Sequence, residues 1–546
     1  MGSIMKYGFI LDNRKCIGCH ACTVACKSEH NVAIGVNRTW VKYIEKGIFP
    51  DSRRFFTVMR CNHCENPPCV AICPVGAMFQ REDGIVDFNN ERCIGCKSCT
   101  QACPYDSIYM DPETSTAAKC NFCAHRIDQG LNPACVNVCP EEAIIVGDMD
   151  NATSAIRKIM GRTQLQTRKA EKGTTPKVYY INSEAAALHP MAAPPTNQYQ
   201  QTAQIAGVGH YAKFAEKRIE ENKSRFVQAM GATLAPYETE IAAKQGVTLA
   251  DAGGEDAKLL KGNMRRTHDA PSKGPLWNWE LPAYLWSKAI ASGIVIIAAL
   301  GSLTGWWNSG NSWFAPGSSF AFLVLTTIFL IKDLDKPSRF LYVILRPQFK
   351  SWLTRGGYIL SVFGVFLALW GFGLLIANDM VVQIAQWGGL IEGIILAGYT
   401  AFLLAQAKGR DFWQSPLLPF HMLTHALMAG AAFFFIATSF NPLSDDFGLL
   451  LKNLLMGALV LNLFILFFEL TVPHPTTDAK LVVKMILGKK FGLLFYSLVL
   501  LAGNILPLVI LGMNIVPFEI AGVLVLFGIA ITEHIWIKAP QLIALS

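Results

Sequence analysis

The sequence predicts two domains of different fold class, an α+β domain followed by an all-α bundle of membrane helices. All 16 cysteines of the 546 residues lie between Cys16 and Cys139. Hydrophobic residues make up 52% of the chain and charged residues only 16%, whereas soluble domains carry about 25% charged residues. We therefore do not expect a wholly soluble protein. The net charge is +8, and the basic residues lie at loop positions rather than in one basic stripe. We therefore expect no nucleic-acid partner.

The cysteines form four blocks whose spacing is typical of iron–sulfur proteins. Each block begins with C-x2-C, and the last three blocks are followed directly by proline. A [4Fe–4S] cubane takes four thiolates, so 16 thiols predict four clusters. We therefore expect an α+β ferredoxin-like domain over residues 1–150 that binds four [4Fe–4S] clusters. The blocks are Cys16, Cys19, Cys22 and Cys26; Cys61, Cys64, Cys69 and Cys73; Cys93, Cys96, Cys99 and Cys103; and Cys120, Cys123, Cys135 and Cys139.

The spacing also predicts which thiols share a cluster. Three thiolates of a block wrap one cluster, and the fourth ligates the other cluster of a pair. Blocks two and three are close in sequence and should form one pair, while blocks one and four flank them and should form the other. The predicted ligand sets are Cys61, Cys64, Cys69 with Cys103; Cys73 with Cys93, Cys96, Cys99; Cys16, Cys19, Cys22 with Cys139; and Cys26 with Cys120, Cys123, Cys135.

Other interpretations of the cysteines are weaker. The string from Cys16 to His20 matches a c-type haem attachment sequence, and any isolated C-x2-C pair can hold zinc. Neither explains why the remaining cysteines complete the ferredoxin spacing four times. A disulfide framework also suits this tight spacing poorly. We expect His20, His63 and His125 to be structural or to tune a cluster, since no cluster lacks a thiolate.

Residues 151–275 are expected to form a linker or strap with surface helices. The stretch is rich in Ala, Lys, Glu and Gln, and apolar residues recur at helical spacing between His210 and Gln245. A strap that packs on a partner subunit and a solvated connector are equally compatible with this composition.

Residues 276–546 are expected to form a membrane domain of eight transmembrane helices. Eight apolar runs reach membrane-spanning length, and an even number of spans places both ends of the domain on one membrane face. The runs are Leu285–Gly305, Phe314–Ile331, Gly357–Ala377, Ile384–Ala405, Leu417–Thr438, Leu449–Thr471, Phe491–Leu511 and Pro517–Ile537.

The loops predict the orientation of this domain. Lys and Arg occur in the loops after spans two, four and six, whereas the loops after the odd-numbered spans contain none. By the positive-inside rule the basic face is cytoplasmic. The first thirty residues lack an apolar region and a cleavage site, so no export signal is expected. We therefore expect a multi-pass protein of the cell inner membrane with its iron–sulfur domain on the cytoplasmic side.

Both halves resemble known families. The first 150 residues resemble the four-cluster ferredoxin-type electron-transfer subunit of complex iron–sulfur molybdoenzymes, the group that includes dimethyl sulfoxide and polysulfide reductases. The second half resembles the polysulfide reductase membrane anchor, or NrfD-like family, in the stretches Asp333–Phe340 and Ser351–Gly356. In most relatives the two parts are separate subunits, so the fusion is a departure from the family pattern.

The resemblance implies a quinone site in the membrane domain. Anchors of this family use a polar residue before the first span, an acid at the end of the second and a tyrosine on the fourth. The matching residues are Asn278, Asp333 and Tyr399, and His421 is a further candidate. Asp333 could instead form an ion pair at its helix end, and Tyr399 could be an ordinary buried aromatic.

Acidic residues inside the spans are candidates for a proton path. A charged side chain in a membrane helix costs about 2.5–3.5 kcal/mol, so such residues are usually functional. Glu392, Glu469 and Glu533 meet this description. His421 and His425 lie four residues apart on one helix face and cannot both be axial ligands of one haem.

The resemblance implies an electron-transfer and membrane-anchor subunit of a respiratory oxidoreductase. It would relay electrons between a molybdopterin catalytic subunit and menaquinone or ubiquinone, with substrate chemistry on the partner chain and quinone chemistry on this one. Two alternatives remain open, a quinone-linked ion-translocating module and a quinol oxidoreductase with a non-molybdenum partner.

Overall fold

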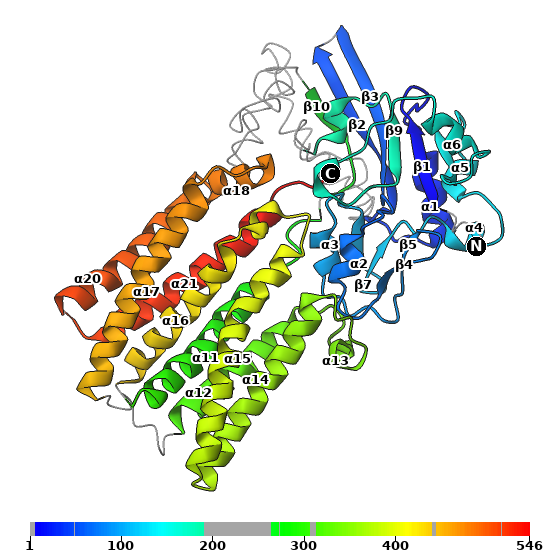
Figure 1. The fold of residues 1–546 in the computed structure, drawn as a ribbon. Coiled ribbons are helices and arrows are strands. Elements are labelled where there is room, and N and C mark those ends of the chain that lie inside the picture. The colour runs from blue at the N-terminus through cyan, green and yellow to red at the C-terminus, as the bar shows by residue number, and fades with distance from the viewer. Residues whose placement is uncertain are drawn as a thin grey trace, which may run out of the picture. The chain divides into compact units, whose positions relative to one another are not determined.

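The chain folds into two compact units. We describe a computed structural model that covers residues 6–48, 50–190, 264–271, 273–305, 313–438, 444–514 and 516–546. The first unit comprises Met1–Val70, Ala77–Gly274 and Ala544–Ser546, and the second comprises Ala71–Gly76 and Pro275–Ile543. Figure 1 shows strands in the first unit and long helices in the second. The predicted order of an α+β domain and an all-α membrane bundle is confirmed.

A three-stranded sheet brings the first and last cysteine blocks of the first unit together. Strand β1 (Tyr7–Asp12) lies between β8 (Ile144–Asp148), which runs antiparallel to it, and β9 (Val178–Ile181), which runs parallel. Block one follows β1 and block four precedes β8. Because antiparallel neighbours place the end of one strand beside the start of the other, this pairing brings the two blocks close.

The other cysteine blocks lie among short hairpins and helices. A second sheet has the order β10-β2-β3, and two separate hairpins pair β4 with β5 and β6 with β7. The remaining elements of this unit are β2 (Thr39–Ile48), β3 (Asp51–Arg60), β4 (Met78–Gln80), β5 (Val86–Phe88), β6 (Ile108–Asp111), β7 (Thr116–Lys119), β10 (Met264–His268), α1 (Ala21–His30), α2 (Pro68–Ile72), α3 (Ser98–Ala102), α4 (Ala124–Ile127), α5 (Ala134–Asn137), α6 (Ala155–Met160), η1 (Ala170–Lys172) and α7 (Ala185–Leu188).

The segment interpreted as a linker contributes strands to both three-stranded sheets. Strand β9 pairs with β1, and β10 pairs with β2. The compact unit therefore continues beyond residue 150, because backbone pairing joins these strands to the cysteine-bearing part. The helical pattern predicted between His210 and Gln245 lies outside the described residues.

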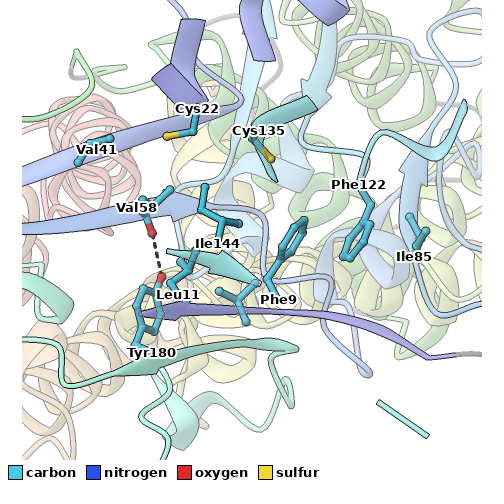
Figure 2. Close-up of a cluster of buried hydrophobic side chains, with 11 residues drawn as sticks. Phe9, Leu11, Cys22, Val41, Val58, Ile85, Phe122, Cys135, Ile144 and Tyr180 are labelled. Atoms are coloured by element: carbon cyan, nitrogen blue, oxygen red, sulfur yellow. Dashed lines mark hydrogen bonds between the residues drawn. The ribbon is translucent and has the colours of Figure 1, made fainter. Parts of the chain in front are cut away.

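A buried core connects the first sheet with the cysteine loops. Phe9 and Leu11 of β1 pack with Val58 of β3, with Ile144 of β8 and with Tyr180 of β9. The Tyr180 hydroxyl donates to the Val58 carbonyl at 3.3 Å, so the largest polar side chain of this cluster is satisfied. Figure 2 shows that Cys22 and Cys135 belong to the same cluster.

Within its described residues, the second unit contains eight helices of membrane-spanning length, as predicted. Each is long and apolar enough to cross a bilayer. The helices are α11 (Glu280–Leu303), α12 (Phe314–Lys332), α14 (Trp352–Leu375), α15 (Asp379–Ala405), α16 (Leu418–Ala437), α17 (Asp445–Thr471), the composite of α19 (Gly492–Leu494), the π-helical η6 (Phe495–Ile505) and α20 (Leu506–Met513), and α21 (Phe518–Gln541). Shorter elements between them are η4 (Pro337–Arg339), α13 (Tyr342–Leu345), η5 (Asp411–Gln414) and α18 (Thr477–Leu487).

Helices α11 and α16 form the centre of the second unit. They are the most buried spans, at 83% and 72% of their apolar windows. They cross closely at Gly293 and Gly430, where a Cβ on Gly293 would clash with the Ala426 carbonyl oxygen. Small residues allow this approach, as in other membrane helix pairs. Helices α15 and α21 pack against this central pair, and α17 packs against α16.

Candidate functional site

The first predicted ligand set lines one cavity of the first unit. Cys16, Cys19, Cys22 and Cys139 all face this cavity, together with Gly18 of the intervening loop. Gly18 has a φ of +73°, and a Cβ there would clash with the Phe56 ring, so the loop requires glycine at this position. Four thiols around one cavity are the donor set that a [4Fe–4S] cubane requires.

The second predicted set, Cys26 with Cys120, Cys123 and Cys135, is also brought together. The thiols of Cys120, Cys135 and Cys123 lie close enough to Cys26 to act on it electrostatically. Burial raises the pKa of the Cys123 thiol to about 12, and Cys120 adds to this effect. Thiols so placed ionise when a metal centre replaces their protons.

The third predicted set groups Cys61, Cys64, Cys69 and Cys103. Burial raises the pKa of Cys69, and Cys103, Cys61 and Cys64 all add to the increase. The backbone amide of His63 donates to the Cys61 sulfur at 3.5 Å. Amides aimed at sulfur are usual around iron–sulfur clusters because they stabilise negative charge.

The fourth predicted set contains Cys73, Cys93, Cys96 and Cys99. Cys73 belongs to the second compact unit and the other three to the first. The Cys93 sulfur accepts from the Ala117 amide at 3.4 Å. This ligand set stays a prediction.

Several histidines lie near the thiols, and their predicted structural or cluster-tuning role stays a prediction. Burial lowers the pKa of His20 to about 4, with a further contribution from His268, so its imidazole is neutral. His63 is fully buried and its Nδ1 accepts from the Val86 amide at 3.1 Å. The sequence did not single out His30, whose Nε2 lies 3.1 Å from the Cys123 sulfur. Among the described residues, no three His, Cys, Asp or Glu side chains converge closely enough to hold a single metal ion.

A buried chain of ionisable side chains joins three helices of the second unit. His421 of α16 contacts Glu469 of α17 (Nδ1 to Oε2, 2.8 Å) and His425 (Nε2 to Nε2, 3.0 Å). His425 in turn contacts Glu533 of α21 (Nδ1 to Oε1, 2.8 Å). All four side chains are buried. We call these residues, Glu469, His421, His425 and Glu533, the Glu–His–His–Glu chain.

Counting hydrogens shows what the Glu–His–His–Glu chain must hold. Each of its three contacts needs one hydrogen between the two heavy atoms. Two neutral imidazoles supply only two hydrogens, so a third proton must be present. The four residues then comprise one imidazolium, one imidazole and two carboxylates, or an equivalent arrangement. The indole of Trp536 donates to the same Glu469 oxygen at 3.2 Å and stabilises that carboxylate.

A second buried polar group adjoins the Glu–His–His–Glu chain. The Tyr399 and Tyr284 hydroxyls are hydrogen-bonded to each other, and the Lys288 ammonium lies 5.0 Å from the centre of the Tyr399 ring. Lys288 donates to the Thr400 hydroxyl and to the Ala397 carbonyl, the latter at 3.0 Å. Its charge also lies close enough to Glu533 to interact with it. Buried polar groups therefore extend from α15 through α11 and α21 to α16 and α17.

The predicted quinone residues do not form a single cluster. His421 lies in the Glu–His–His–Glu chain with the predicted proton-path residues Glu469 and Glu533. Asn278 is exposed and Asp333 is half-buried. Their neighbours Trp279 and Lys332 meet, with the ammonium 4.4 Å from the indole ring, so both residues lie at one end of the second unit.

Glu392 stands apart from the other predicted proton-path residues. It is half-buried near the middle of α15. Within the described part of the chain it forms no hydrogen bond or ion pair.

Comparison with known proteins accounts for both units. Residues 269–543 match the family model described as polysulphide reductase, NrfD, which covers half of the sequence. This protein belongs to the polysulphide reductase NrfD family. Residues 15–78 and 53–149 of the NrfD-family protein each match a model described as a 4Fe-4S dicluster domain.

Relatives of the first unit are subunits of reductases. The NrfD-family protein is 43% identical over 190 residues to the B subunit of tetrathionate reductase from Salmonella typhimurium, covering 34% of this protein and 76% of that relative. It is 42% identical over 188 residues to the B subunit of polysulfide reductase from Wolinella succinogenes, covering 34% and 97%. It is 34% identical over 229 residues to ArrB, the iron–sulfur subunit of arsenate respiratory reductase from a Shewanella species, covering 33% and 97%.

These findings define the protein at a coarse level. It is a multi-pass membrane protein in which an electron-transfer subunit with [4Fe–4S] clusters is fused to an NrfD-type membrane anchor. The sequence did not reveal Tyr284 and Trp536 as partners of the predicted residues, because tyrosines and tryptophans are common near the ends of membrane helices.

The number of clusters can be tested by iron analysis. Four cubanes correspond to about 16 iron atoms per chain. Replacing Cys103 with Ser removes one ligand of the third set, and we expect iron and acid-labile sulfide to fall by about a quarter. The Cys103→Ser protein and the unaltered protein should be purified anaerobically from membranes and compared. About eight iron atoms in the unaltered protein would contradict the assignment of four clusters.

Proposed function

We propose that this protein relays electrons through four [4Fe–4S] clusters between a molybdopterin-containing catalytic subunit and the membrane quinone pool. The observation that carries the proposal is the buried Glu–His–His–Glu chain in a membrane anchor fused to iron–sulfur domains. A protein that carried electrons only along a soluble path would have no need of buried proton-holding groups in its membrane unit.

Quinone chemistry matches what these buried residues can supply. A quinone takes up two electrons and two protons, whereas each cluster carries one electron at a time. The residues around the site must therefore donate hydrogen bonds to the carbonyl oxygens and exchange protons with them. The Tyr399 and Tyr284 hydroxyls can donate, and the third proton of the Glu–His–His–Glu chain is available for transfer.

Placement at one end of the second unit supports a single quinone site there. Tyr399 lies in the last turns of α15, His421 in the first turn of α16 and Glu533 in the last turns of α21. Asn278 and Asp333 lie at that same end, before α11 and after α12. We propose Asn278 and Asp333 as residues of its entrance and Tyr399 and His421 as residues of its interior.

The catalytic partner is proposed from the relatives. These are the B subunits of tetrathionate and polysulfide reductases and the iron–sulfur subunit of arsenate respiratory reductase. We infer that a large subunit with a molybdopterin centre carries out the substrate chemistry, while this protein handles electrons and the quinone.

The orientation is proposed from charge. The loops that follow α12, α15 and α17 carry the basic residues, and the loops at the other end carry none. This asymmetry supports a cytoplasmic position for the iron–sulfur unit in the cell inner membrane.

Ion translocation is less well supported than electron transfer. The Glu–His–His–Glu chain lies towards one end of the spans, and Glu392 is not joined to it by any contact in the described residues. The arrangement therefore supports proton delivery to a quinone rather than a path across the membrane, and the ion-translocating alternative stays a prediction.

Replacing His421 with Gln tests the proposed proton source. Glutamine can bridge Glu469 and His425 but cannot hold the extra proton. We expect quinol-dependent turnover to fall about 10²-fold, because a positioned proton donor contributes about that much. The measurement is steady-state turnover with a soluble quinol analogue, alongside the electron paramagnetic resonance signal of the reduced clusters, which should not change.

His534→Gln is the matched control for this substitution. His534 lies on α21, is half-buried and makes no hydrogen bond within the described residues. Turnover of His421→Gln within twofold of this control would contradict the proposed role.

Purification from native membranes tests the proposed partner. The full chain, carrying an affinity tag, should co-purify with a large subunit, and metal analysis should find about one molybdenum per chain. A complex that turns over quinol but contains neither molybdenum nor tungsten would instead support the alternative of a non-molybdenum partner.

Protease accessibility tests the proposed orientation. We expect the iron–sulfur unit to be cleaved in inverted membrane vesicles and protected in intact spheroplasts, because the basic loops face the cytoplasm. Immunoblotting against the first unit reads out the result. Cleavage in spheroplasts alone would show that the unit faces the periplasm.

A further inference from the structure

Two buried cations occupy equivalent positions in blocks two and four. Arg60 precedes Cys61 in Arg60-Cys61-Asn62-His63-Cys64, and Lys119 precedes Cys120 in Lys119-Cys120-Asn121-Phe122-Cys123. Both sequences follow the pattern Arg/Lys-Cys-Asn-x-Cys. Each cation is also the last residue of a strand, Arg60 of β3 and Lys119 of β7. The same local structure thus delivers a cation to the first cysteine of two different blocks.

Arg60 lies among the thiols of blocks one and four. Its side chain is 1% exposed, and its Nη1 donates to the Cys135 sulfur at 3.4 Å. Its guanidinium lies 4.4 Å from the centre of the Phe9 ring, in the core cluster of Figure 2 that includes Cys22 and Cys135. The Nε and Nη2 atoms have no hydrogen-bond partner among the described residues.

Arg60 contributes a fixed positive charge, because the guanidinium of arginine stays protonated in proteins. This charge lies close enough to the sulfurs of Cys135, Cys120 and Cys22 to interact with them.

Lys119 lies near the thiols of block two. It is fully buried, and its ammonium donates to the Val86 carbonyl and to the Cys120 carbonyl, the latter at 3.1 Å. Its charge also lies close enough to the sulfurs of Cys61 and Cys69 to interact with them. Both cysteines belong to the third predicted ligand set.

Each of the two cations interacts with the block that the other one precedes. Arg60, which precedes block two, contacts block four, whereas Lys119, which precedes block four, acts on block two. Within the described part of the chain, neither cation forms an ion pair with Asp or Glu. A buried charge without a partner is strongly destabilising, so an anion must compensate each cation.

We propose that Arg60 and Lys119 set the reduction potentials of the clusters beside them by stabilising their reduced forms. Four thiolates around a [4Fe–4S] core give a net negative charge, and uptake of one electron adds a further negative charge. A fixed cation favours the more negative state and raises the potential. The proposal rests on the ligand sets proposed above, with Arg60 acting on the clusters of blocks one and four and Lys119 on the cluster held by Cys61, Cys64, Cys69 and Cys103.

Redox titration of the variants tests this proposal. The full chain in its membrane complex is titrated under argon, and each cluster is followed by electron paramagnetic resonance. In Arg60→Gln we expect the oxidised-to-reduced ratio of at least one cluster to rise about tenfold at a fixed potential, which is a fall of about 59 mV for a one-electron couple. Lys119→Gln should produce a similar fall in a different cluster.

Charge-preserving and surface variants separate electrostatics from packing. Arg60→Lys and Lys119→Arg keep the positive charge, so the same ratio should change less than about threefold. Arg54→Gln is the matched control, since Arg54 lies on the same strand as Arg60 but its side chain is 52% exposed. All cluster potentials of that variant should equal those of the unaltered protein.

Iron content separates this proposal from the assignment of the clusters. Full iron content with potentials in Arg60→Gln and Lys119→Gln equal to those of Arg54→Gln would overturn the potential-setting role while leaving the clusters in place. Loss of iron from both variants would also overturn it, because the cations would then be structural. A fall in potential at full iron content, reversed by the charge-preserving variants, would support it.

Discussion

Burial of charge in a medium of low dielectric constant is the constraint on which both units depend. In the first unit, thiols that must ionise to bind iron are buried beside Arg60 and Lys119. Neither cation has a carboxylate partner among the described residues. In the second, two glutamates are buried between helices and are each matched by an imidazole at 2.8 Å. An unmatched buried charge costs several kcal/mol, so each group fixes its neighbour's place as well as its charge.

In the proposed function, the two units carry different particles under this constraint. A cluster accepts one electron without a proton, so the first unit needs only fixed cations that hold the reduced form. A quinone takes up electrons and protons together, so the second unit needs groups that can change protonation. His421 and His425 share an extra proton between two carboxylates and meet that need. The fusion in one polypeptide keeps the two kinds of carrier in fixed proportion.

Features set by residues close in sequence could be predicted, whereas features set by tertiary contacts could not. Cysteine spacing predicted the cluster domain because the cysteines of each block are close in sequence, at most 20 residues from first to last. Apolar runs predicted all eight spans because a bilayer fixes their length. Strands β9 and β10 escaped prediction because their pairing partners are distant in sequence. His421 pairs with Glu469, 48 residues away, and only helix packing could show that a predicted quinone residue shares its contacts with a predicted proton-path residue.

Electron exchange between the clusters and a quinone is the central claim, and its stoichiometry can be measured directly. The purified protein is reduced with dithionite, freed of excess reductant under argon and mixed with a soluble menaquinone or ubiquinone analogue in a stopped-flow spectrometer. Because a quinone takes two electrons and a cluster gives one, each quinone should reoxidise two clusters, seen as recovery of the iron–sulfur absorbance. Clusters that stay reduced in the presence of excess quinone, in a protein with full iron content, would contradict the account.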